Sequence, residues 1–393
     1  MATTAAAGHV ATEVADKAGS QSGLPWYLWC ASAAVTSAIM GGLWDISWHE
    51  SIGRDTFWTP AHVAIYMCGV LAGIAYGYLI LSTTFSADSK LESSSVQILG
   101  LRGPLGAFIA SWGGIAMLVS APFDNWWHDA YGLDVEILSP PHVLLFIGIY
   151  AILAGTLVLI AGHMNRAAGL ERKAARNLYL YVAGIATLAA GLVTLQLTFR
   201  TLLHNSSPYI AISVLIPIVM AITSRATGVK YAATFVSGFY MAVMIALILI
   251  LPLFPAEPKL GPVYQHVTHF IPPPFPLLLV VPGIVLDLFW SVTGRWKPWT
   301  LAGCSGVLFV ASLVAVQYPF ASFLMSPASR NAFFGTMYFS YATSPASYGL
   351  RGLFYLTDTP AQFWTGLLIA VLCATAATRF GIARGEWMAR VKR

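Results

Sequence analysis

The stretch WDISWHESIGRDTFWTPAHVAIY, from Trp44 to Tyr66, joins the end of one apolar run to the beginning of the next. A second stretch, FDNWWHDAYGLDVEILSPPHVLLF from Phe123 to Phe146, follows the same order of residue types. Each contains an Asp, then Trp-His-acid, then Gly-x-Asp, and finally a histidine that closely follows proline. The flanking runs are long enough to cross a bilayer as helices. The sequence therefore predicts two similar hairpins, a parallel repeat in which helices 1–2 correspond to helices 3–4.

The composition of the whole chain also indicates a membrane protein. Of the 393 residues, 57% are hydrophobic and only 9% are charged, whereas a soluble domain carries about 25% charged residues. So little charge cannot cover a water-exposed surface, and we expect lipid around most of the chain. The predicted fold class is all-α, a polytopic transmembrane bundle of about ten helices. The apolar runs are 25–48, 60–83, 104–127, 140–163, 177–200, 208–224, 231–254, 273–294, 299–322 and 361–382.

The basic residues predict the orientation of these helices. Sixteen Lys and Arg side chains fall on one side of the predicted membrane and five on the other. Because basic loops stay in the cytoplasm, both termini should be cytoplasmic in an inner membrane. Because the basic residues fall in short loops between apolar runs, they indicate membrane topology and do not indicate a nucleic-acid-binding surface. We divide the chain into a disordered cytoplasmic tail at 1–24, a membrane domain at 25–200, and additional helices of unassigned role at 201–393.

The first stretch carries a set of potential metal ligands. Asp45 and His49 are four residues apart, a spacing that puts both on one helix face. His62 follows Pro60 and should lie in the first turn of the next helix, beside the end of the preceding one. One carboxylate and two imidazoles suit a divalent transition metal such as copper, iron or zinc.

The second stretch repeats the set with Asp124, His128 and His142. Ionisable groups at membrane level are costly and usually functional, so their repetition favours two metal sites over chance. Both sets should face the outer side, where the loop between helices 3 and 4 is acidic and attracts cations. His204, His266 and His269 are further candidate ligands on that side. Structural roles for these residues, such as hydrogen bonding at the interface, are the alternative.

At these residues the chain resembles the C subunit of the copper membrane monooxygenases, a family that includes particulate methane monooxygenase and ammonia monooxygenase. The stretch DISWHESIGRDTFWTPAH is similar to the family signature D-x3-H…RDT-x-FTP-x-H, with Asp45, His49 and His62 at the copper-ligand positions. The second cluster is similar to the neighbouring copper site of the family, where Asn stands in place of Asp124. The resemblance covers roughly the first 150 to 200 residues.

The resemblance implies a copper-dependent membrane monooxygenase, or a subunit of one, that oxidises a small apolar substrate with dioxygen. Electrons would come from an external donor, and partner membrane subunits or further copies of the chain are expected. A metal transporter or storage protein is the alternative, but a transporter should place polar residues deep in the later helices. Asp287 is the clearest such residue. A structural membrane subunit with a polar cap is the third interpretation.

Overall fold

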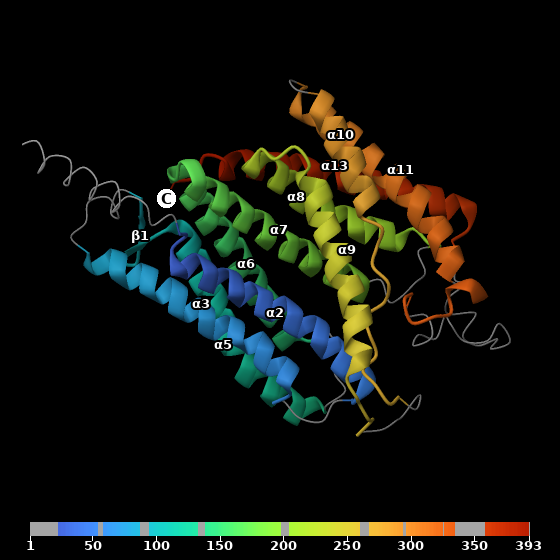
Figure 1. Cartoon of the computed structure of the whole chain (residues 1–393), viewed down its shortest axis with the longest axis horizontal. Coiled ribbons are helices and arrows are strands. Elements are labelled where there is room, and N and C mark those ends of the chain that lie inside the picture. Colours follow the sequence, from blue (N-terminus) through green and yellow to red (C-terminus); the bar gives the residue numbers. More distant parts are fainter. Residues whose placement is uncertain are drawn as a thin grey trace, which may run out of the picture.

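The computed structural model is essentially all-α (Figure 1). It describes residues 23–53, 58–86, 94–132, 138–197, 204–259, 267–293, 296–324, 326–334 and 358–392. The helices are α2 (Trp26–Ser51), α3 (Pro60–Phe85), α5 (Leu105–Tyr131), α6 (Pro140–Arg166), α7 (Gly169–Leu197), α8 (Ser207–Thr227), α9 (Ala232–Ile250), α10 (Val280–Val292), α11 (Pro298–Leu324) and α13 (Pro360–Met388). Among the described residues, nine helices are long and apolar enough to cross a membrane, which confirms a multi-pass membrane protein.

Proline marks the beginning of many of these helices. Pro60 and Pro140 are the first residues of α3 and α6, while Pro25 and Pro104 directly precede α2 and α5. Pro208 is the second residue of α8. Proline is tolerated there because the first N–H groups of a helix have no partner within it. The apolar runs expected to begin at residues 25, 60, 104, 140 and 208 therefore begin within one residue of those positions as helices.

The prediction of a full-length helix over residues 273–294 was wrong. Only α10, from Val280 to Val292, is helical, and residues 270–278 have no regular structure. Its 13 residues span about 20 Å, less than the roughly 30 Å hydrocarbon core. The sequence Pro272-Pro273-Pro274 followed by Pro276 prevents an earlier start, because proline lacks an N–H and disfavours helix in the residue before it.

In each of the two predicted hairpins, the two helices approach each other closely. A Cβ at Gly41 of α2 would lie 2.8 Å from the backbone nitrogen of Ile65 in α3. In the second hairpin, a Cβ at Gly113 of α5 would lie 2.5 Å from the carbonyl oxygen of Gly148 in α6. Small residues allow such backbone approach, which supplies much of the packing between membrane helices. The parallel arrangement of one hairpin relative to the other stays a prediction.

Helices of both halves of the chain share one hydrophobic core. The largest cluster of buried side chains extends from Leu28 in α2 to Met388 in α13. In Figure 1, α2, α3 and α5 lie at one side of the molecule, α10 and α11 at the other, and α7 and α8 between them. Large apolar side chains such as Val70 and Leu118 are exposed on the outside, as a lipid-facing surface requires. Residues 1–22 of the predicted tail lie outside the described part of the chain.

The remaining elements are short. A hairpin of β1 (Val96–Ile98) and β2 (Leu101–Gly103) connects α3 to α5 at the end of the bundle opposite the acidic and histidine clusters. Its turn places Leu99 and Gly100 at positive φ, the conformation of a tight two-residue hairpin turn. Two single 3-10 turns, η1 (Leu251–Leu253) and η2 (Pro327–Ser329), follow α9 and α11.

Asp287 has a structural explanation. This carboxylate of α10 is only 2% exposed, and it accepts hydrogen bonds from the first turn of α9. The donors are the backbone nitrogen of Ala233 at 3.3 Å, and the backbone nitrogen and hydroxyl of Thr234, each at 2.7 Å. The first N–H groups of a helix need acceptors and favour negative charge. Asp287 therefore caps α9 from a neighbouring helix.

Candidate metal centres

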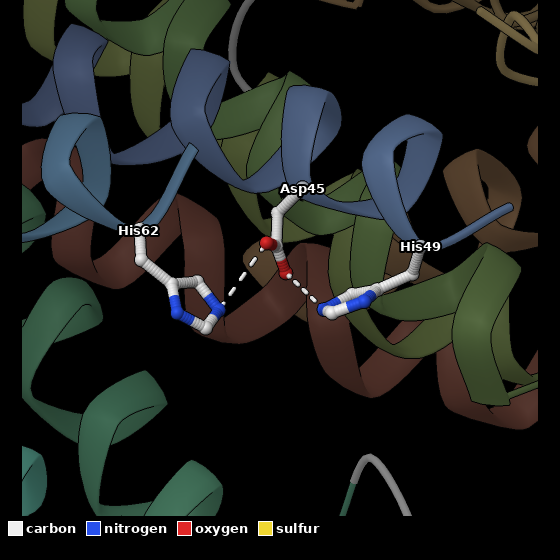
Figure 2. A group of neighbouring side chains, drawn as sticks. All are labelled: Asp45, His49 and His62. Atoms are coloured by element: carbon white, nitrogen blue, oxygen red, sulfur yellow. Dashed lines mark ion pairs between the residues drawn. The ribbon is translucent and has the colours of Figure 1, made fainter. Parts of the chain in front are cut away.

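The first set of predicted ligands converges in the structure. The Nε2 atom of His49 lies 3.5 Å from one carboxylate oxygen of Asp45, and the Nε2 atom of His62 lies 3.2 Å from the other. Figure 2 shows the carboxylate between the two imidazole rings, with both rings turned toward it. The ring centroids are 6.1 Å apart. We call this set of three residues centre 1.

Local structure explains how centre 1 forms. Asp45 and His49 project from the same face of α2, near its end. Thr59 caps α3, its side chain accepting a 3.1 Å hydrogen bond from the backbone nitrogen of His62. Together with Pro60 this cap fixes the first turn of α3, so that the imidazole of His62 points back toward α2.

Centre 2, made of Asp124, His128 and His142, has nearly the same geometry. The Nε2 atom of His128 lies 3.5 Å from one oxygen of Asp124, and the Nε2 atom of His142 lies 3.3 Å from the other. The imidazole centroids are 6.4 Å apart. As in centre 1, the aspartate and the first histidine are four residues apart near the C-terminal end of one helix. The second histidine follows a proline by two residues and lies in the first turn of the next helix.

The ligand atoms in each centre surround a common point. One atom from each residue can be chosen so that all three lie within 4.8 Å of one another. Metal–nitrogen and metal–oxygen bonds of about 2.0–2.2 Å at tetrahedral angles separate neighbouring ligand atoms by about 3.4 Å. The observed nitrogen–oxygen separations of 3.2–3.5 Å, each measured to a different oxygen of the carboxylate, are close to this value. Each triad could therefore hold a metal ion.

The carboxylates support this interpretation. In the described structure, the Oδ1 atoms of Asp45 and Asp124 are buried, and each lies beside an imidazole nitrogen, Nε2 of His62 at 3.2 Å and Nε2 of His142 at 3.3 Å. A buried carboxylate is costly unless it is paired, and a cation bound between the carboxylate and the imidazoles would compensate for that cost. Centre 1 lies at the C-terminal end of α2 and centre 2 at the C-terminal end of α5. Figure 1 shows the last turns of these two helices at one end of the bundle.

Aromatic side chains neighbour the ligands of both centres along the chain. Trp44 and Trp48 alternate with Asp45 and His49 in α2, and the Trp48 and Phe270 ring centroids are 5.8 Å apart. In α5, Trp127 packs on Tyr131 with centroids 4.4 Å apart. Such rings supply apolar surface at the helix ends that carry the ligands.

The other candidate ligands do not join either triad. His204 hydrogen-bonds with the hydroxyl of Ser322 at 2.9 Å, and Nδ1 of His269 hydrogen-bonds with the neighbouring Thr268 at 2.8 Å. Among the described residues, only the two triads form a group of three or more potential ligands. His266 lies outside the described residues, as do Arg54 and Asp55, which stand between His49 and His62 in the sequence.

One contact beside centre 1 could not be predicted from the sequence. Ser47 and Ser51 of α2 flank His49 along the chain, and both bind the backbone of Ile271. The hydroxyl of Ser47 donates to the Ile271 carbonyl at 2.5 Å, and that of Ser51 accepts from the Ile271 nitrogen at 2.7 Å. The second half of the chain thus holds the end of α2 that carries centre 1. Only the apolar, proline-rich character of this segment is visible in the sequence.

Comparisons of the chain with protein families, with characterised proteins and with solved structures found no match. The fold and the ligand sets are therefore the observations from which function is argued. They describe a membrane-spanning helical protein with two Asp/His clusters that could bind metal. A set of two imidazoles and one carboxylate accepts copper, iron or zinc, and the set alone does not choose among them.

Proposed function

We propose that this protein is a copper-binding integral membrane protein that takes part in the dioxygen-dependent oxidation of a small apolar substrate. The observation that carries the proposal is the convergence of one carboxylate and two imidazoles in each of two centres at one end of the bundle. Copper is chosen over iron and zinc because the motifs around both centres resemble those of the copper membrane monooxygenase C subunit.

Three protein ligands leave coordination positions free for an exogenous ligand such as dioxygen. The aromatic and aliphatic side chains around each centre suit an apolar substrate that arrives from the bilayer. An external electron donor would supply the reducing equivalents, and partner membrane subunits or further copies of the chain would complete the enzyme. Under the basic-residue bias, both termini face the cytoplasm and the centres face the outside.

A metal transporter or storage protein would use the same clusters to capture cations. A transport pathway also requires polar groups along the membrane interior. Asp287, the clearest polar residue of the later helices, is engaged in capping α9. This favours fixed metal sites over a pathway.

The test is the identity and coordination of the metal in purified protein held in lipid. We expect copper by elemental analysis, with a Cu(II) electron paramagnetic resonance spectrum that shows hyperfine coupling to imidazole nitrogens. The His49→Ala variant should lose the part of the signal that belongs to centre 1. Stoichiometric zinc or iron in protein prepared with copper available would overturn the copper assignment. Metal uptake across vesicles would instead support the transporter.

A further inference from the structure

We propose that the two centres have different tasks, centre 2 holding a tightly bound ion and centre 1 an exchangeable one that is open to external ligands. This inference rests on the proposed metal-binding function. Both centres use the same three residue types in nearly the same geometry, so the difference must come from their surroundings. Two independent observations distinguish them.

The first observation is the burial of the carboxylates. The side chain of Asp124 in centre 2 is 6% exposed, whereas that of Asp45 in centre 1 is 18% exposed. An ionised carboxylate that is removed from water loses hydration, and a bound cation must compensate for this loss. The more deeply buried Asp124 therefore gains more from a metal ion. The more exposed Asp45 leaves centre 1 accessible from outside the protein.

The second observation is the support of the histidine at the end of the first helix of each hairpin, His128 in centre 2 and His49 in centre 1. The Nδ1 atom of His128 lies 3.2 Å from the carbonyl oxygen of Gly132. A carbonyl only accepts hydrogen bonds, so Nδ1 carries the proton and the lone pair of Nε2 is directed at centre 2. In centre 1 the Nδ1 atom of His49 is buried without a hydrogen-bond partner. Centre 2 is thus preorganised at a position where centre 1 is not.

The backbone conformation of Gly132 allows its carbonyl to accept this hydrogen bond from His128. Gly132 follows His128 by four residues and has φ 93° and ψ 168°, a conformation that is essentially restricted to glycine. Gly53 follows His49 by the same four residues and has φ 96°. Both glycines have positive φ, but of the two histidines in the described structure it is His128 whose Nδ1 bonds the carbonyl of its glycine. The loss of such a supporting bond typically weakens metal binding by about 10–100-fold.

A matched pair of variants tests the inference on the full-length protein in lipid. His62→Ala removes a ligand of centre 1, and His142→Ala removes the corresponding ligand of centre 2. Each histidine is the third residue of its helix and follows proline. Both variants are loaded with Cu(II) and challenged with a graded series of EDTA concentrations, and the retained copper is measured together with Tm.

We expect His62→Ala, which keeps centre 2, to retain its ion at EDTA concentrations at least about tenfold higher than those that strip His142→Ala. Copper should also raise the Tm of His62→Ala more than that of His142→Ala. Equal retention, or stronger retention by His142→Ala, would overturn the division of tasks and leave metal binding intact. Copper binding by neither variant nor wild type would overturn the proposed function itself.

The glycine pair then tests the cause. An alanine at position 132 is incompatible with φ 93°, so Gly132→Ala should displace the carbonyl and lower copper retention at centre 2 toward that of centre 1. The matched Gly53→Ala change strains the backbone equally but breaks no bond to His49, and the order of the two centres should persist. A larger loss in Gly53→Ala than in Gly132→Ala would contradict this role of the His128–Gly132 bond.

Discussion

The cap that Asp287 forms on α9 gives a prediction that separates a structural role from a transport role. Asp287→Asn keeps the size of the side chain and one oxygen acceptor. It removes the charge and turns an amide NH2 toward backbone nitrogens that are themselves donors. The change loses the hydrogen bonds to whichever oxygen is replaced, at least the 3.3 Å bond from the Ala233 nitrogen, together with the favourable interaction of a carboxylate with a helix N-terminus.

A hydrogen bond to a charged group contributes about 1.5–3 kcal/mol, and a buried donor left without a partner costs about 1–3 kcal/mol. We therefore expect Asp287→Asn to lower the free energy of unfolding by about 2–4 kcal/mol, seen as a fall of several degrees in Tm in lipid or detergent. Metal stoichiometry should not change. Asp129→Asn is the control, because Asp129 is exposed and accepts a long hydrogen bond of 3.4 Å from Asn125. An unchanged Tm combined with loss of metal binding or uptake would refute the capping role.

Three further outcomes follow from the fold and the ligand chemistry. Reporter fusions after Arg176 and after Arg393 should both lie in the cytoplasm, and a fusion within 133–137 should lie outside; an inside result there would reverse the topology. Gly113→Leu should separate α5 from α6 and lower both Tm and copper retention, whereas the neighbouring Gly114→Leu, which faces open space, should do neither. Acidification should lower copper affinity, since imidazoles must lose their protons to bind metal, and a pH-independent affinity measured by competition would place the ion on other ligands.

Local spacing was enough to predict much of the candidate sites. The interval of four residues between Asp45 and His49 fixes a shared helix face, and Pro60 fixes the start of the helix that carries His62. Both features depend only on neighbours in the chain, so they could be read before any packing was known. The same holds for centre 2 and for the nine long apolar helices of the described chain.

Features that depend on distant parts of the chain could not be predicted. The capping role of Asp287 requires α9 to lie beside α10, and no local pattern states that. The bonds of Ser47 and Ser51 to Ile271 join residues more than 200 positions apart. The eighth apolar run shows a different failure, because hydrophobicity predicted a helix where consecutive prolines at 272–274 prevent one. The side chains of an Asp/His triad also do not specify which transition metal they bind.

The most direct test of the account is metal stoichiometry in wild type and in the His49→Ala/His128→Ala double variant, both purified in lipid with copper available and without chelators. Each substitution removes one of only three protein ligands from its centre. The apolar helices do not depend on these ligands, so Tm should show a persistent fold while the metal is lost. We predict up to two copper ions per wild-type chain and none above background in the folded double variant. Wild-type protein without stoichiometric metal, or copper that persists in the double variant, would contradict the central claim.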